Sequence, residues 1–208
     1  GVVDPAATPD DDRALSVSSP VVNEGSPTVV FTVSGAPNQL VSLALANVTT
    51  GGLSGLQYST DGGQTWNTYT SGNVALNGSG KMLVRTSLTP EQESASDNGE
   101  TLTLTAANTS GTPAVGTGTV KDDGTGSIFK ADGTEDTEKV KDDDRPVTVS
   151  SPVVNEGSPT VVFTVSGAPN QLVSLALANV TTGGLSGLQY STDGGQTWNT
   201  YTSGNVAL

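Results

Sequence analysis

An internal repeat constrains this chain more than any other feature of its sequence. Residues 17–76 return without a single change as residues 149–208. The acidic motif in front of them is also repeated, as "DDDRALSVSS" from residue 10 and "DDDRPVTVSS" from residue 142. Because a core tolerates many volume-conserving substitutions, folding alone does not require such identity. The repeat indicates recent duplication within a tandem array, with a designed or chimeric chain as the alternative.

Residues inside the first repeat alternate between apolar and polar side chains, and short segments of this kind are separated by Gly, Asn and Pro turns. We expect about eight strands between residues 14 and 120, a spacing typical of an immunoglobulin-like β-sandwich. No stretch shows the 3.6-residue apolar period of an amphipathic helix. The predicted inward faces are Val29, Phe31 and Val33; Val41, Leu43 and Leu45; Met82, Val84 and Leu88; and Leu102 and Leu104.

The second copy stops at Leu208, the equivalent of Leu76. It lacks the counterparts of "KMLVRTSL", "TLTLTAAN" and "VGTGTV". A sandwich without these strands is expected to expose sheet edges and half of its core, and not to be stable alone. The sequence does not decide whether the missing part is disordered, removed by proteolysis, left out of this chain or supplied by another molecule.

The composition of the chain excludes several kinds of metal site and catalytic mechanism. The chain has no cysteine and no histidine, which excludes disulfides, thiolate or imidazole metal sites and histidine-based catalysis. Acidic residues outnumber basic ones 21 to 8, and the resulting net charge of −13 disfavours nucleic acid and anionic lipid as partners. The remaining metal ligands are oxygen atoms, which suit Ca²⁺.

Residues 121–145, "KDDGTGSIFKADGTEDTEKVKDDDR", carry nine of the 21 acidic residues. Such a stretch is commonly a solvated, flexible spacer. Here the acids are clustered beside predicted strand ends, where backbone carbonyls are available as ligands. Ile128 and Phe129 also supply an apolar anchor that a disordered spacer does not need. We therefore expect ordered calcium sites, because Ca²⁺ takes about six to eight oxygens and ties several loops together.

Three motifs give the chain a resemblance to a known family. "VVNEGSPTVVFTVSG", followed later in the repeat by "GTGTVKDDGTGS", resembles the Calx-β type of repeat. With "DDDRP" opening the next copy, the chain more closely resembles the extender repeats of bacterial RTX adhesins, over essentially its whole length. The resemblance implies calcium-bound immunoglobulin-like domains that hold a distal ligand-binding region away from the cell. It also implies type I secretion to the bacterial cell surface.

In that family the Glu of "NEG" and the Asp pair that ends the last strand lie near calcium. The resemblance therefore points to Glu24 and Glu156, and to Asp122 and Asp123. Together with the acidic clusters it gives these candidate calcium ligands: Glu24, Asp122, Asp123, Asp132, Asp136, Asp142, Asp143, Asp144, Glu156, Asp10, Asp11 and Asp12.

The expected organisation is all-β, with immunoglobulin-like sandwich repeats in tandem joined by an acidic calcium-binding linker. Residues 1–13 are the tail of a preceding linker and residues 14–120 the first repeat. Residues 121–145 are the acidic linker, and residues 146–208 are the N-terminal part of a second, incomplete repeat.

The stretch "STDGGQTW" at residues 59–66 matches the Asp-box of sialidases and related β-propellers. A sialidase needs several boxes and an arginine cluster, whereas this chain has one box per repeat and three arginines in total. A local interpretation is sufficient: Asp61 accepts hydrogen bonds from the following amides, the glycines adopt positive φ, and Trp66 plugs the sandwich. Asp61 as a further calcium ligand is the lesser alternative.

Four acidic residues in "TPEQESASDNGE" permit other interpretations. A solvated loop is favoured over a calcium loop, and a catalytic carboxylate pair would need a concave pocket between its members. The residues concerned are Glu91, Glu93, Asp97 and Glu100.

These inferences predict a structural extender rather than an enzyme. Its expected partners are neighbouring repeats of the same chain, with Ca²⁺ at their joints and without nucleic acid, membrane insertion or a small-molecule substrate, and we expect a monomer. One alternative is a glycan- or protein-binding module that uses exposed Trp66, Tyr58 or Tyr69. The other is an enzyme that works with carboxylates alone.

Overall fold

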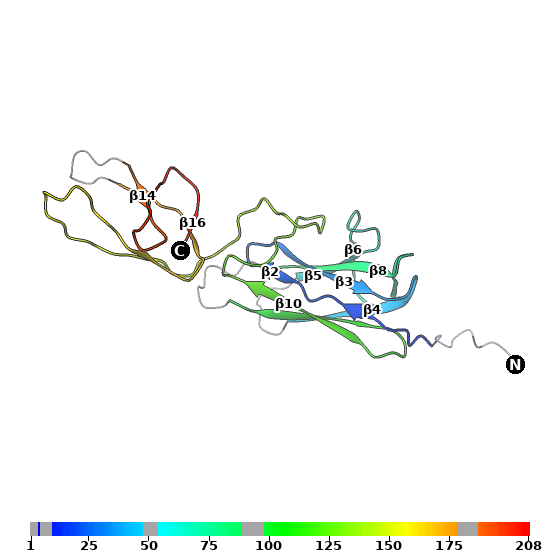
Figure 1. Ribbon diagram of the computed structural model, residues 1–208. Helices are drawn as coiled ribbons and strands as arrows, with labels where there is room; N and C mark the ends of the chain where they lie inside the picture. The colour runs from blue at the N-terminus through cyan, green and yellow to red at the C-terminus, as the bar shows by residue number, and fades with distance from the viewer. Residues whose placement is uncertain (1–3, 5–9, 48–53, 89–97, 179–186) are drawn as a thin grey trace. The chain divides into compact units, whose positions relative to one another are not determined.

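The structure is a computed structural model, and it describes residue 4 and residues 10–47, 54–88, 98–178 and 187–208. All secondary structure in this part of the chain is β, in sixteen strands and without a helix (Figure 1). The prediction of an all-β chain is confirmed.

The chain divides into two compact units, Gly1–Asp142 and Asp143–Leu208. The first unit contains ten of the described strands. They are β1 (Ser16–Val17), β2 (Val21–Asn23), β3 (Thr28–Ser34), β4 (Leu40–Asn47), β5 (Ser54–Ser59), β6 (Asn67–Thr68), β7 (Val74–Ala75), β8 (Lys81–Ser87), β9 (Thr101–Ala107) and β10 (Ala114–Lys121).

The strands of the first unit form two five-stranded sheets, in the orders β1-β3-β8-β5-β6 and β2-β10-β9-β4-β7. Phe31 of β3 and Val84 of β8 lie opposite each other in the first sheet, and Leu45 of β4 lies opposite Leu104 of β9 in the second. The inner faces of both sheets contribute to one hydrophobic core. This arrangement is consistent with a β-sandwich, and the predicted inward faces are confirmed by the burial of their side chains.

The first two strands of the chain are close in sequence but belong to different sheets. β1 pairs antiparallel with β3, and β2 pairs parallel with β10. The crossing runs close to β10, because a Cβ on Gly116 would lie 2.1 Å from the carbonyl oxygen of Ser18. A Cβ on Gly118 would lie 3.0 Å from the ring of Phe31. Gly116 therefore leaves room for the crossing chain, and Gly118 leaves room for the ring of Phe31.

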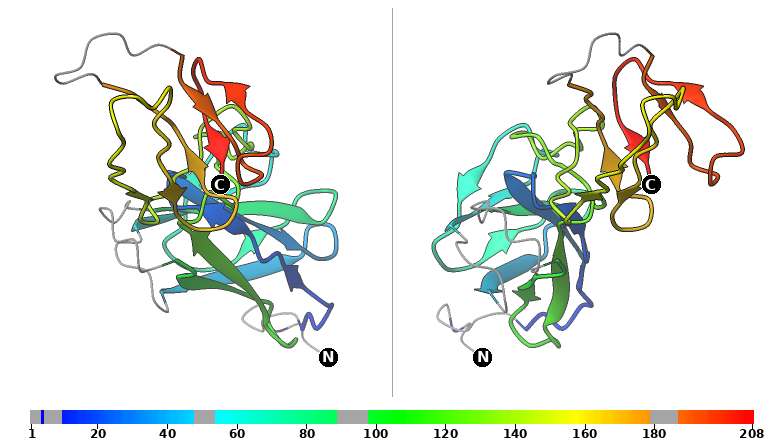
Figure 2. Two further views of the ribbon diagram at one scale, coloured as in Figure 1. Left: turned by 60° about the vertical axis from the view of Figure 1, so that its left-hand side comes forward. Right: turned by 90° about the vertical axis from the view of Figure 1, so that its left-hand side faces the viewer.

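The second unit contains six strands of two residues each, paired as β11-β12, β13-β16 and β14-β15 (Figure 2). They are β11 (Thr148–Val149), β12 (Val165–Ser166), β13 (Leu172–Val173), β14 (Gln189–Tyr190), β15 (Asn199–Thr200) and β16 (Val206–Ala207). Side chains that are buried in the first unit are exposed here, Phe163 among them. The predicted exposure of an incomplete core is confirmed.

Candidate metal centre

The acidic segment is folded onto the first unit over residues 121–142. Ser127 lies beside β2: its N–H donates to the carbonyl of Val21 at 3.0 Å, and its carbonyl accepts from the N–H of Asn23 at 2.9 Å. Ile128 is buried, and Phe129 packs against the sandwich core. The predicted apolar anchor is confirmed, and it attaches the segment to the open edge of β2.

A turn follows this anchor. The N–H of Lys130 donates to the carbonyl of Thr134 at 2.7 Å, and Gly133 adopts a φ of 83° between them. The Oδ1 atom of Asp132 accepts from the N–H of Thr134 at 2.9 Å and from its hydroxyl at 2.6 Å. The hydroxyl of Thr134 is the main cause of the lowered pKa of Asp132. Asp132 therefore shapes this turn.

Asn23 joins the two ends of the acidic segment. This fully buried residue donates from Nδ2 to the carbonyls of Lys121, Thr125 and Asp142 at 3.2, 3.0 and 3.0 Å. Its Oδ1 atom accepts from the N–H groups of Gly25 and Asp142 at 3.0 and 2.8 Å. One amide side chain thus uses both its donor and acceptor atoms to hold residues that are far apart in the sequence.

The end of β10 brings several predicted ligands together. Asp122 is 2% exposed, both of its carboxylate oxygens are shielded from solvent, and its N–H donates to Oδ1 of Asn98 at 3.2 Å. Asp123 accepts from the hydroxyl and the N–H of Thr125 and from Nδ2 of Asn98. The pKa of Asp123 is lowered, chiefly by the hydroxyl of Thr125.

Two further acidic residues form backbone hydrogen bonds with the end of β10. The N–H of Glu24 donates to the carbonyl of Lys121 at 2.8 Å, and the carbonyl of Glu100 accepts from the N–H of Val120 at 2.8 Å. The loops after β2, before β9 and after β10 therefore meet around Asp122. Glu91, Glu93 and Asp97 lie outside the described residues.

The middle acid of each acidic triplet has the same partners in both copies. Asp11 pairs with Arg13, with Oδ2 2.8 Å from Nη2, and Oδ1 accepts from Nε2 of Gln39 at 3.2 Å. The side-chain bond from Arg13 is the main cause that lowers the pKa of Asp11 to about 2. In the second unit Asp143 pairs with Arg145 at 2.7 Å. The middle acid of each triplet is therefore held by an arginine that sequence analysis did not connect with it.

The other predicted ligands lie in different surroundings. Asp10, Asp12, Asp142 and Glu156 are exposed. Asp136 is half-buried and accepts from the N–H of Glu138 at 3.2 Å. Oδ1 of Asp144 is shielded from solvent and has no hydrogen-bond partner among the described residues.

The donor set around Asp122 has the chemistry that Ca²⁺ prefers, because it consists of carboxylate and carbonyl oxygens. Within the described ranges, however, no three acidic side chains are grouped closely enough to hold a metal ion. A calcium ion at this place would need carbonyl or water oxygens in addition to the carboxylate of Asp122.

The Asp-box turn has the predicted local structure. Asp61 accepts from the N–H of Thr65 at 2.9 Å, and the hydroxyls of Ser59 and Thr65 also donate to it. Gly62 and Gly63 adopt φ values of 77° and 93°. The bond from the hydroxyl of Thr65 is the main cause that lowers the pKa of Asp61 to about 2.

Trp66 does not plug the sandwich, contrary to our prediction. Arg85 alternates along β8 with the buried residues Val84 and Thr86, so its side chain lies on the outer face of the sheet. Its guanidinium carbon lies 4.1 Å from the centroid of the Trp66 ring. A Cβ on Gly133 would lie 2.7 Å from the same ring. Trp66 is therefore held between the guanidinium of Arg85 and the turn of the acidic segment at Gly133.

Arg85 also connects the sheet with the acidic segment. Its guanidinium donates to Oε1 of Gln57 at 2.8 Å and to the carbonyl of Ala131. Tyr58 and Tyr69 are partly buried against the core, and the hydroxyl of Tyr69 donates to the carbonyl of Gly72 at 2.8 Å. The aromatic residues suggested for glycan or protein binding are thus engaged within the unit.

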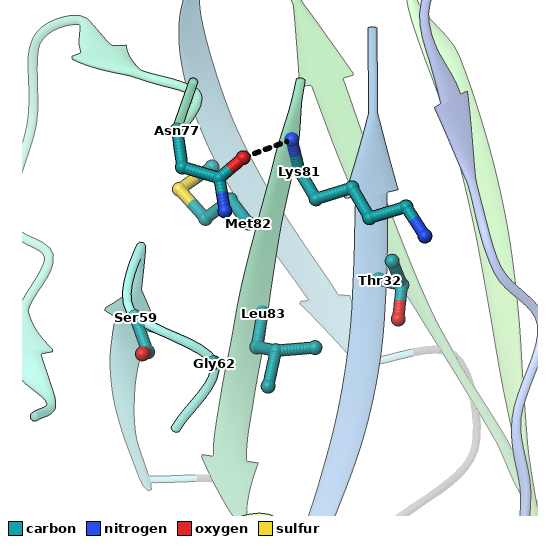
Figure 3. A pocket seen from close by; sticks show the side chains of 7 residues that line it. All are labelled: Thr32, Ser59, Gly62, Asn77, Lys81, Met82 and Leu83. Carbon is teal, nitrogen blue, oxygen red and sulfur yellow. Dashed lines mark hydrogen bonds between the residues drawn. The ribbon is translucent and has the colours of Figure 1, made fainter. Parts of the chain in front are cut away.

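A cavity of about 240 Å³ lies on the first sheet, lined by residues that include Ser59, Lys81 and Leu83. Figure 3 shows the backbone nitrogen of Lys81 donating to Oδ1 of Asn77, at 2.9 Å. The lining contains no carboxylate, so the paired acids that a glycosidase needs are not assembled in this cavity.

No protein-family model matches the chain, and no curated protein is significantly similar to it. Among the described residues, the structure contains no helix with the length and apolar character that crossing a membrane requires.

Proposed function

We propose that the chain is a structural extender segment of a large bacterial cell-surface adhesin. Ca²⁺ bound at the ends of its sandwich would stiffen the stalk, which projects a distal ligand-binding region away from the cell. Its partners are neighbouring repeats of the same chain, and it reaches the cell surface by type I secretion. The observation that carries this proposal is the burial of Asp122 at the end of β10, where three loops meet.

The order of the strands supports an immunoglobulin-like fold for the repeat. β1-β3-β8-β5 corresponds to the A-B-E-D sheet of such a sandwich, and β10-β9-β4 corresponds to the G-F-C sheet. Domains of this kind place their two ends far apart along the sandwich. Tandem copies are therefore suited to building length.

Burial of Asp122 supports a cation at the end of the sandwich. Removing a carboxylate from water is costly unless positive charge or hydrogen bonds compensate for it. The carboxylate of Asp122 would hold Ca²⁺ together with carbonyl or water oxygens of the adjoining loops, which carry Glu24 and Asp123. Such an ion would link the loops that meet around Asp122.

Calcium binding of this kind changes stability by mass action. Sites in extracellular modules have Kd values of about 10⁻⁴–10⁻³ M. At a tenfold excess of Ca²⁺ over Kd, one site adds about 1.4 kcal/mol to the free energy of unfolding. Several sites would be a large part of a total that is about 5–15 kcal/mol for most domains.

Removal of calcium from matched variants tests this proposal. We expect 10 mM Ca²⁺ to raise the melting temperature of the wild-type chain by about 4–8 °C relative to EDTA. Asp122→Asn should lose most of this increase, whereas Glu138→Gln should keep it, because Glu138 is an exposed acid on the same segment. Equal melting temperatures of the wild-type chain in calcium and EDTA would contradict the proposal.

Small-angle scattering measures the mechanical consequence. Calcium should give a long rod, and EDTA should give a shorter mean dimension with a broader distribution. An unchanged distance distribution after chelation would show that calcium does not stiffen the chain, even if it binds.

A further inference from the structure

Residues 122–142 of the acidic segment form a stored loop, which is folded back so that its two ends lie together. Nδ2 of the buried Asn23 donates to the carbonyl of Lys121, at the end of β10, and to the carbonyl of Asp142, at 3.2 and 3.0 Å. Because one nitrogen atom reaches both carbonyls, the chain gains almost no length between Lys121 and Asp142. The residues between them are therefore chain length held against the first unit.

The stored loop lies where tension on the chain would act. The chain leaves the loop at Asp142 and continues directly into the second unit, which begins at Asp143. At the other end of the first unit, the carbonyl of Arg13 accepts from Nδ2 of Asn108 at 2.7 Å, beside the start of β10. A pull on the two ends of this unit therefore acts along β10 and reaches the loop at Asp142.

The end of the stored loop is held by a few hydrogen bonds. The N–H of Asp142 donates to Oδ1 of Asn23 at 2.8 Å, in addition to the bond that its carbonyl accepts from Nδ2. Nζ of Lys139 donates to the carbonyl of Gly25 at 2.7 Å. Residues 137–142 belong to no strand. These bonds are the first to bear tension.

The middle of the stored loop is held by a second group of contacts. Ile128 is 1% exposed, and Phe129 packs against the sandwich core. The guanidinium of Arg85 donates to the carbonyl of Ala131. These contacts come under load only after residues 137–142 have detached, so the contacts of the loop bear tension one after another.

The strands of the sandwich bear load in a different way. β10 pairs with β9 over Ala114–Thr119 and with β2 over Thr119–Lys121. Inter-strand hydrogen bonds run across the strands, so a pull along β10 shears all of them at once. These bonds share the force, whereas the contacts of the stored loop do not. The loop should therefore detach while the sandwich remains folded.

The composition of the stored loop suits both an attached and a detached state. Its large apolar side chains are Ile128, Phe129 and Val140, and Val140 is already 74% exposed. Charged segments repel themselves and stay extended in water. Reburial of Ile128 and Phe129 against the intact sandwich favours return of the loop. Closing a loop of this size is fast compared with folding a sandwich.

We propose that the stored loop is a tension buffer, which detaches from the first unit under load and returns when the load falls. Fully extended, residues 122–142 span about 70 Å. This function goes beyond the extender proposal and rests on it only for the source of the tension. The ordered attachment and the solvated spacer, which were alternatives for this segment, are then two states of the same residues.

Stretching single molecules of the full chain in optical tweezers tests the proposal. Handles are attached through azide-bearing amino acids in place of the exposed residues Ala14 and Val147. We expect an early, reversible extension of about 70 Å, and at higher force a second one of more than about 300 Å as the sandwich unfolds. The measurement is made in EDTA, so that failure of the calcium proposal does not affect the result.

An insertion assigns the early extension to the stored loop. Ten Gly and Ser residues placed after Glu138, which is exposed, should lengthen the early extension by about 35 Å. The second extension should stay the same, because the insertion lies outside the sandwich.

Substitutions then identify the bonds that hold the loop. Asn23→Ala should raise the rate of early release at a given force at least about tenfold, because Asp142 loses both of its bonds to the amide. Lys139→Ala should raise this rate about three- to tenfold. Lys141→Ala is the matched control and should change the rate by less than about twofold, because the described residues show no such bond from Lys141. Lys139 and Lys141 are exposed, so neither substitution disturbs the core.

Three results would overturn the proposal. One is the absence of an early extension, with the loop released only when the sandwich unfolds. Another is an early extension that the insertion does not lengthen, because it would then arise elsewhere in the chain. The third is a release rate that neither Asn23→Ala nor Lys139→Ala changes relative to Lys141→Ala.

Discussion

Residues 17–76 and 149–208 share one sequence but differ in structure. The first copy contains seven- and eight-residue strands in two complete sheets, and the second contains strands of two residues. The difference coincides with β8, β9 and β10, which complete the first copy. Strand formation in this repeat therefore depends on partners distant in sequence, as is typical of β-structure.

Other features are the same in both copies because they are local. Tyr58 and Tyr69 form an edge-to-face pair with ring centroids 6.4 Å apart, and Tyr190 and Tyr201 repeat it at 6.3 Å. The glutamine whose Nε2 donates to the middle acid of the triplet and to the carbonyl of the arginine is buried in both units. Turns and short-range contacts are thus determined by the sixty residues themselves, whereas the sheets are not.

The largest expected difference between the copies concerns the core phenylalanine. Phe31→Ala should lower the free energy of unfolding of the first unit by about 3–5 kcal/mol, because it leaves a cavity in a closed core. Phe163→Ala should cost less than about 1 kcal/mol, because that ring is 45% exposed. Urea unfolding followed by circular dichroism measures both.

The two variants control for each other, since each removes the same atoms from the same local sequence. Equal losses of stability would mean that the second copy has a closed core in solution. The two copies would then not differ in how well their cores are closed.

Much of the first sandwich could be predicted from alternation of side chains, because a half-buried strand must place every second residue in the core. The crossing from β1 to β2 was missed. Its signal is weak: a Pro at residue 20, and a glycine at residue 116 that leaves room for the carbonyl of Ser18. Trp66 was placed wrongly because its partners, Arg85 and Gly133, are distant in the sequence.

The candidate site was predicted less completely. The acidic clusters and the anchor at Ile128 were recognised from composition, but the role of Asn23 was not. An asparagine before a Glu-Gly turn suggests a local turn, and the sequence does not show that its amide also reaches Lys121 and Asp142. Pairing of Asp11 with Arg13 was within reach, because both lie in one short motif.

An intermediate effect is expected at this asparagine. Asn23→Ala should cost about 2–3 kcal/mol, because buried carbonyls of the acidic segment lose their donor. Asn155→Ala should cost less than about 1 kcal/mol, because Asn155 is exposed and accepts from the N–H of Gly157 at 2.9 Å. Chemical unfolding measures the loss, and hydrogen exchange at Ser127 and Gly124 measures release of the segment. Unchanged exchange in Asn23→Ala would show that the anchor at Ile128 holds the segment without this amide.

The smallest effect, and the only one that should be equal in both copies, concerns the Asp-box turns. The pKa of Asp61 is lowered to about 2 and that of Asp193 is lowered as well, in both cases chiefly by the hydroxyl of the threonine four residues later. Each carboxylate therefore stabilises its turn fully above its ordinary pKa of 3.8, and this contribution disappears as the pH falls through the lowered value. Asp61→Asn and Asp193→Asn should both be less stable than the wild-type chain at pH 6, and the deficit should shrink as the pH falls from about 4 toward 2.

Carbon-13 NMR of the aspartate carboxyl groups measures these titrations directly. The two substitutions assign the signals, since each removes one of a pair that would otherwise be difficult to distinguish. Both signals should titrate well below 3.8, because the Ser, Thr and backbone donors lie within six residues of each carboxylate in both copies. A signal of Asp193 near 3.8 beside a lowered one of Asp61 would show that the turn also needs the strands that complete the first sandwich. Local and long-range contributions would then be coupled in this repeat, and the distinction between its turns and its sheets would have to be abandoned.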